Sequence, residues 1–108
     1  MQILQYLDRD GSNPFAEWFN GLDAHAAAKV TIAIARMEQG NRSNAKSVGG
    51  GVLEFRIDFG PGYRIFFGRG GDTLILLLGG GTKRRQQQDI ATAQARWSDY
   101  RRRKNQGR

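Results

Sequence analysis

Apolar and polar residues alternate from residue 53 to residue 59, and this period of two predicts a β-strand with one buried face. Its polar face carries Glu54, Arg56 and Asp58. Glycine turns at 60–62 and 70–71 separate this strand from two further apolar runs, which predict two more strands in an antiparallel meander. The last run, 73–78, is apolar on both faces, as expected for a central strand.

The rest of the chain predicts one more strand and three helices. Residues 2–7 form a short opening strand, and Asn13 with Pro14 begins a helix whose apolar positions recur at helical spacing. Asp23 caps a second helix over 24–39, and the short link predicts that the two helices pack as an antiparallel hairpin. A final helix is expected over 86–103. Residues 40–51 have the composition of a loop. Residues 79–82 are expected to end the last strand abruptly, because three of them are glycines.

The turn lengths predict a strand register. Pairing Phe59 with Tyr63 makes Arg56 and Arg64 diagonal neighbours on one face. Pairing Arg69 with Asp72 places Arg64 opposite Leu77, so that Ile75 and Leu77 form an apolar floor beside Arg64 and the other leucines of the run complete the core side. The expected fold class is α+β, a β-α-α-β-β-β-α chain with a small, mainly antiparallel sheet against a helical hairpin and a C-terminal helix.

Length and composition predict the number of domains, the absence of a metal site and the location of the protein. The 108 residues predict one domain over 1–108, with a frayed basic tail over about 101–108. The chain has no cysteine and one histidine, His25, so no metal site and no cofactor is predicted. No apolar run approaches membrane-spanning length and the N-terminus does not resemble a signal peptide, so we expect a cytoplasmic protein without a membrane partner.

Charge is distributed unevenly along the chain. Residues 1–81 hold eight basic and eight acidic side chains, whereas residues 82–108 hold nine basic and two acidic ones, which accounts for the net charge of +7. Such a basic end attracts polyanions, nucleic acid first and an acidic protein second. A solvated tail that only aids solubility is the alternative.

The catalytic inventory excludes several enzyme classes. There is no Ser-His-Asp set and no cysteine nucleophile, and the glycine run before Lys83 lacks phosphate-loop spacing. What remains is a cationic sheet face suited to binding phosphate. Its proposed catalytic residues are Arg56, Arg64 and Lys83, and its proposed substrate-binding residues are Lys46, Tyr63, Arg69, Arg84 and Arg85. Arg42, in the same segment as Lys46, is a further candidate phosphate contact.

Such a face is suited to cleaving RNA, because the 2′-hydroxyl of RNA attacks the adjacent phosphorus without an outside nucleophile. The protein then supplies orientation, charge stabilisation and proton transfer. Lys83 is the first candidate proton carrier, and Tyr63 and Asp58 are weaker ones. A basic groove that binds nucleic acid or an acidic partner without chemistry is the alternative.

Three sequence motifs resemble those of a known toxin superfamily. They are Leu53-Glu54-Phe55-Arg56, then Gly60-Pro61-Gly62-Tyr63-Arg64 and Gly79-Gly80-Gly81-Thr82-Lys83. Together with the predicted element order they resemble the RelE/ParE superfamily of bacterial toxin–antitoxin modules over about residues 1–100. The HigB-like branch, the addiction-module killer proteins, is the most similar.

This resemblance implies a ribosome-dependent mRNA endonuclease that is neutralised by a helix-turn-helix antitoxin. It implies that Arg56 and Arg64 bind the phosphate, with Lys83 matching the pattern of the branch and Lys46 in support. The chain departs from the pattern in two respects, since it has no histidine near the site and it continues into a long C-terminal helix without a catalytic tyrosine after the last strand. The general acid and base are therefore unassigned, and a DNA gyrase poison on the same fold is the alternative function.

Overall fold

The computed structural model describes residues 1–41 and 43–106 of the chain. Within that part it is an α+β structure with five strands, three α-helices and one short 3-10 helix. In chain order the elements are β1 (Gln2–Gln5), α1 (Pro14–Asn20), α2 (Ala24–Glu38), β2 (Ala45–Gly49), β3 (Val52–Ile57), β4 (Tyr63–Gly70), β5 (Leu74–Thr82), η1 (Lys83–Arg85) and α3 (Gln86–Gln106). The predicted class is confirmed, with β2 as an additional strand inside the segment that was predicted to be a loop.

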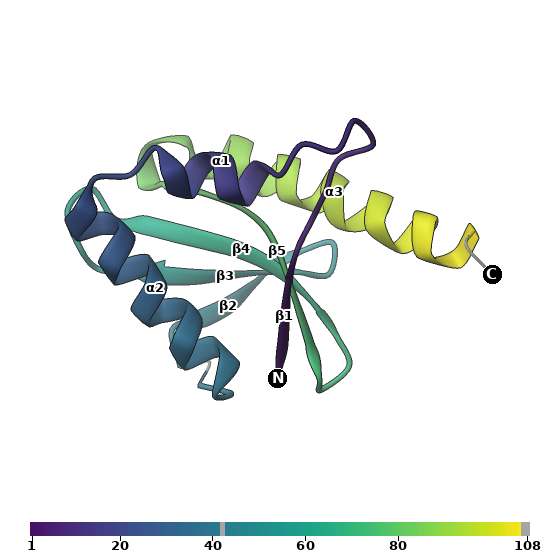
Figure 1. Ribbon diagram of the computed structural model, residues 1–108, viewed down its shortest axis with the longest axis horizontal. Helices are drawn as coiled ribbons and strands as arrows, with labels where there is room; N and C mark the ends of the chain where they lie inside the picture. Colours follow the sequence, from purple (N-terminus) through teal and green to yellow (C-terminus); the bar gives the residue numbers. More distant parts are fainter. Residues whose placement is uncertain (42, 107–108) are drawn as a thin grey trace.

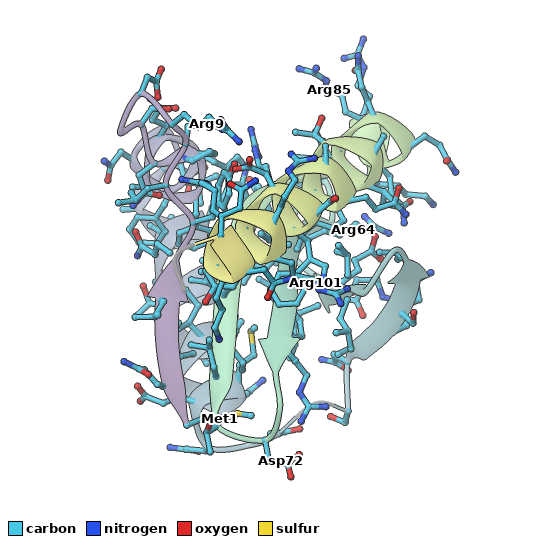
Figure 2. The ribbon with its side chains drawn as sticks, turned by 90° about the vertical axis from the view of Figure 1, so that its right-hand side faces the viewer. Met1, Arg9, Arg64, Asp72, Arg85 and Arg101 are labelled. Carbon is cyan, nitrogen blue, oxygen red and sulfur yellow. The ribbon has the colours of Figure 1, made fainter. Side chains whose placement is uncertain are left out.

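The strands form one mixed sheet in the order β1-β5-β4-β3-β2. β1 runs parallel to β5, and the other neighbouring strands are antiparallel. Figure 2 shows α3 crossing the near face of this sheet, with β1 (purple) and β2 (blue) at the two edges. The register of β1 with β5 ends at the pair Gln5–Leu77, so the second half of β5 extends beyond its partner.

Both faces of the sheet are covered by helices. On one face Phe15 of α1 and Val30 of α2 belong to a core with Phe55, Ile65 and Leu77 of the strands. α1 lies mainly against β5 and α2 against β3, so the two helices pack on the sheet more than on each other, unlike the predicted hairpin. Figure 1 shows that α1 and α2 run in different directions across this face.

The other face is covered by α3. Its Ala93 and Trp97 pack against Val52, Phe66 and Leu76 of the sheet. Gly68 makes this contact possible, because a Cβ atom there would lie 2.2 Å from Cε3 of Trp97. The face that carries Arg56 and Arg64 is therefore partly covered by the C-terminal helix.

The predicted helix starts are confirmed in detail. Asn13 Oδ1 accepts a hydrogen bond from the Ala16 backbone N–H at 3.0 Å, and Pro14 occupies the first turn of α1. Asp23 Oδ1 caps α2 in the same way, by accepting from the Ala26 backbone N–H at 2.9 Å. Each side chain satisfies a backbone donor that the first helical turn leaves unpaired.

The register of β3 with β4 differs from the prediction by two residues. Ile57 pairs with Tyr63 and Arg56 with Arg64, so the two arginines share one face as directly opposed partners and not as diagonal neighbours. The connection is longer than the predicted three-residue loop because its backbone closes a turn, in which Gly62 N–H donates to the carbonyl of Phe59 at 3.0 Å.

The register of β4 with β5 also differs, because β5 contains a bulge. Phe67 pairs with Leu77 but Phe66 pairs with Gly79, which leaves one extra residue on β5 and reverses the faces beyond it. Arg64 is consequently paired with Gly81 instead of Leu77. The predicted apolar floor beside Arg64 is wrong, since Ile75 and Leu77 lie in the core against α1 and α2.

The glycine run 79–81 lies within β5 and is not the predicted exit from the sheet. A Cβ atom at Gly80 would lie 2.3 Å from Cε3 of Trp18, and one at Gly81 would lie 2.1 Å from Oδ2 of Asp89. The run therefore allows side chains of α1 and α3 to approach the strand closely from its two faces.

The chain end also differs from the prediction. α3 continues to Gln106, so residues 101–106 are helical and not a frayed tail. Arg103 in this segment donates to the carbonyl of Leu7 at 2.6 Å. Arg42, a predicted phosphate contact, and residues 107–108 lie outside the described part of the chain.

Candidate functional site

A buried ion pair lies at the centre of the predicted site. Glu54 of β3 is 1% exposed and Arg64 of β4 is 6% exposed. Arg64 Nε donates to Glu54 Oε1 at 3.3 Å, and Arg64 Nη1 donates to the carbonyl of Gly62 at 3.3 Å. Two of the three guanidinium nitrogens are thus engaged, and the carboxylate offsets the positive charge of Arg64.

Two further elements converge on the same carboxylate. Gln86, the first residue of α3, donates from Nε2 to Glu54 Oε2 at 2.8 Å. Lys46 of β2 lies with Nζ 4.0 Å from Glu54 Oε1, and its side chain is largely exposed. Glu54 therefore connects β2, β3, β4 and the start of α3.

Arg56 lies beside this network with its charge exposed to solvent. It is directly opposite Arg64, and its Nε atom is 3.8 Å from Oδ1 of the exposed Asp58. Arg56, Lys46 and Glu54 share the lining of a cavity of about 160 Å³ with residues 43–45. Two exposed cations thus flank a small cavity with a carboxylate in its wall, an arrangement that attracts anions to its rim.

Lys83 approaches the network through the backbone of the glycine turn. Its N–H donates at 3.1 Å to the carbonyl of Gly62, the same oxygen that accepts from Arg64. The side chains of Lys83, Arg84 and Arg85 are exposed on η1. In Figure 2 Arg64 lies beneath the first half of α3, and Arg85 projects outward at the start of that helix.

Two of the predicted site residues are not brought to this cluster. Tyr63 is buried on the opposite face of the sheet, where its ring packs with those of Trp18 and Phe59. Arg69 lies at the other end of β4, opposite Ile75, and forms an ion pair with Asp72 at 3.4 Å. The structure brings together Arg56, Arg64, Lys83 and Lys46, with Arg84 and Arg85 adjoining them.

Sequence reasoning missed the central roles of Glu54 and Gln86. Glu54 is in phase with Arg56 on the polar face of β3, which predicts exposure, but α3 and Arg64 bury it. The only signal in the sequence is a carboxylate on the same face as two arginines. Gln86 offers no signal, because it is one of three consecutive glutamines.

Two kinds of feature are absent from the part of the chain that the structure describes. Within residues 1–41 and 43–106, no three His, Asp or Glu side chains gather as a ligand set for a metal ion. No helix in the same residues is both long enough and apolar enough to cross a bilayer.

Comparisons with known proteins add two matches. The model of a family described as "Phage derived protein Gp49-like (DUF891)" matches residues 17–98, which include Glu54, Arg56, Arg64 and Lys83. A protein of Haemophilus influenzae strain Rd, described as uncharacterized, is 40% identical over 81 residues. That match covers 74% of this chain and 82% of the relative.

Proposed function

We propose that this chain, which belongs to the phage-derived Gp49-like family, is the toxin of a toxin–antitoxin module and cleaves mRNA on the ribosome. The family is toxin-like and related to the addiction-module killers of the RelE/ParE type. The observation that carries the proposal is the cluster of exposed cations, Lys46, Arg56 and Lys83, around the buried Glu54–Arg64 pair. A helix-turn-helix antitoxin is the proposed partner.

The proposed reaction breaks one phosphodiester bond with the substrate's own nucleophile. The 2′-oxygen loses its proton and forms a bond to phosphorus, while the bond from phosphorus to the 5′-oxygen breaks and that oxygen gains a proton. The products are a 2′,3′-cyclic phosphate and a 5′-hydroxyl. Arg56 and Lys46 bind the non-bridging oxygens, because their exposed charges flank the cavity.

Arg64 has a more restricted role in this proposal than Arg56. Its guanidinium is oriented by Glu54 and Gly62, so that only the third nitrogen remains to contact the phosphate. Glu54 is not the proton acceptor, since it is buried and both of its oxygens already accept hydrogen bonds. Lys83, exposed and anchored beside Arg64 by its backbone, is the proposed proton carrier.

The test combines expression in a bacterial host with mapping of transcript ends. The unmodified chain should arrest growth and cut transcripts at codon-linked positions, leaving cyclic phosphates. Arg56→Ala should lower the cleavage rate by about a hundredfold or more, the usual loss for one charge-stabilising group. Arg36→Ala is the matched control, because Arg36 is an exposed arginine on α2, across the sheet from the site.

The outcomes separate the proposal from its alternatives. Growth arrest with intact transcripts and DNA breaks would indicate a gyrase poison. RNA binding that Arg56→Ala weakens, without cleavage by either form, would indicate a non-catalytic module. Restored growth on co-expression of a neighbouring helix-turn-helix gene would support the antitoxin partner.

A further inference from the structure

A second cleft lies at the free edge of β5, between α1 and the first half of α3. Its volume is about 440 Å³, within the range of small-molecule sites. It forms where β5 extends beyond the pairing of β1, which ends at Leu77. Two carboxylates, Glu17 and Asp89, and two arginines, Arg85 and Arg96, line the cleft beside Trp18, Gly79 and Gly80.

The carboxylate of Asp89 has no partner in the described chain. It is half-buried against Gly81, and burial raises its pKa against the opposing charges of Arg85 and Arg96. Each arginine donates one hydrogen bond to another group and keeps its remaining nitrogens available. Arg96 Nη1 donates to the carbonyl of Leu78 at 2.8 Å, and Arg85 Nη2 donates to Gln88 Oε1 at 3.0 Å. The cleft thus presents a partly buried carboxylate, flanked by two cationic groups, whose oxygens accept no hydrogen bond from the described residues.

The walls of the cleft suit a planar ligand. The Trp18 ring packs on the Cβ side of Gly80 and the Arg96 guanidinium on that of Gly79, so the flat surfaces that line the cleft are those of these two side chains. Aromatic rings and arginine guanidinium planes stack on nucleobases in proteins that bind single strands. A ligand that combines a planar ring, adjacent hydrogen-bond donors and an anionic group would match all of these features.

The short helix η1 links the cleft to the proposed proton carrier, Lys83. Lys83 and Arg85 are two residues apart on the same 3-10 helix, so their side chains project about 120° apart around it. Lys83 lies toward Arg64, and Arg85 lines the cleft. A single strand that crosses η1 can therefore place a phosphate at the first position and the neighbouring nucleotide in the second.

We infer that this cleft binds one base of the RNA and selects guanine, with the Asp89 carboxylate accepting from guanine N1–H and N2–H. Arg85 and Arg96 then attract the phosphate of that nucleotide. Among the four bases only guanine presents two adjacent donors on its Watson–Crick edge, so a carboxylate prefers it. This inference rests on the proposed function, because it takes RNA as the substrate.

The test is titration of the full chain with GMP, AMP, CMP, UMP and inorganic phosphate, followed by NMR of the Trp18, Gly80 and Asp89 resonances. GMP should bind about tenfold tighter than the other nucleotides, as expected for a bidentate contact. Asp89→Asn should remove this preference without weakening the binding of inorganic phosphate, because it removes a negative charge beside Arg85 and Arg96. Glu38→Gln, an exposed carboxylate on α2, is the matched control.

A second variant keeps the test informative if Asp89→Asn perturbs folding. Arg85 is exposed, so the Arg85→Ala variant should fold. It should weaken the binding of all four nucleotides by a similar factor and leave their order of affinity unchanged. Equal binding of all nucleotides and of phosphate by the unmodified chain would overturn the inference. Binding is measured without ribosomes, so guanine selection without RNA cleavage would overturn only the proposed function.

Discussion

At the scale of single residues, the position of Arg64 depends on Glu54. Arg56 and Arg64 are directly opposed across two strands, an arrangement in which like charges repel. Glu54 offsets this repulsion through its ion pair with Arg64, while Arg56 remains in solvent, where water screens its charge. One buried carboxylate therefore allows two arginines to occupy neighbouring positions and assigns them different roles.

Removal of that carboxylate should destabilise the protein strongly. We expect Glu54→Ala to lower the free energy of unfolding by about 3–5 kcal/mol, because it leaves the buried Arg64 charge without a partner. Urea unfolding measures the change. Lys46→Ala is the control and should cost less than about 1 kcal/mol, since Lys46 is largely exposed and 4.0 Å from Glu54. Equal losses in the two variants would contradict this account of Glu54.

At the scale of elements, α3 is attached to the N-terminal segment by a polar cluster around Asp99. Tyr6 donates from its hydroxyl to Asp99 Oδ2 at 2.6 Å, and Arg103 pairs with the same oxygen at 2.6 Å. The Tyr6 hydrogen bond, aided by Arg103, lowers the pKa of Asp99 to about 2. Burial, followed by the bond to Asp99, raises the pKa of Tyr6 to about 12. Both shifts favour the protonation states found near neutral pH.

The stability that this cluster contributes should depend on pH at both extremes. The Asp99 contribution is present above its ordinary pKa of 3.8 and is lost as pH falls through about 2. The Tyr6 contribution is present below 10.0 and is lost as pH rises through about 12. Tyr6→Phe should raise the pKa of Asp99 toward its ordinary value. It should also remove the loss of stability at alkaline pH that is due to ionisation of Tyr6.

Urea midpoints across this pH range and carboxyl NMR of Asp99 check this prediction. Tyr100→Phe is the control, because Tyr100 stacks on Trp97 and is not among the groups that shift the pKa of Asp99. An Asp99 pKa that stays near 2 in Tyr6→Phe would show that Tyr6 does not hold it there.

At the scale of the whole molecule, positive charge is concentrated along one helix. Residues 82–108 carry nine basic and two acidic side chains, and most of them belong to η1 and α3. Figure 1 shows α3 extending to the C-terminal end of the molecule, away from α1 and α2. An RNA strand at the proposed site would therefore meet further cations along α3 that position it without taking part in cleavage.

The salt dependence of RNA binding should reveal whether these cations neutralise phosphates. Arg101 and Lys104 are exposed on α3, and we expect the double variant Arg101→Ala, Lys104→Ala to bind single-stranded RNA more weakly. The slope of log K against log salt should become shallower by about 0.7 for each phosphate that the variant no longer neutralises. The cleavage rate at saturating RNA should not change. An unchanged slope would show that α3 does not touch the strand.

The sequence alone predicted the features that depend on local physics. Helix caps at Asn13 and Asp23, the period-two strand β3 and the final helix from residue 86 follow from short-range spacing, and the structure confirms them. The placement of Arg56 and Arg64 on one face was also predictable, because alternation along a strand is local. β2 was not predicted, since its short, glycine-flanked segment becomes a strand only by pairing with β3.

The tertiary structure decided the features that depend on interactions between distant residues. The bulge after Leu77 reverses the faces of β5, and no local pattern shows which pairing satisfies the backbone hydrogen bonds. The burial of Glu54 required both Arg64 and α3 to close over it, and the cleft at Asp89 required β1 to end at Gln5, opposite Leu77 of β5. Local spacing thus placed the charges on the sheet, and packing decided which of them are buried in pairs and which remain exposed to solvent.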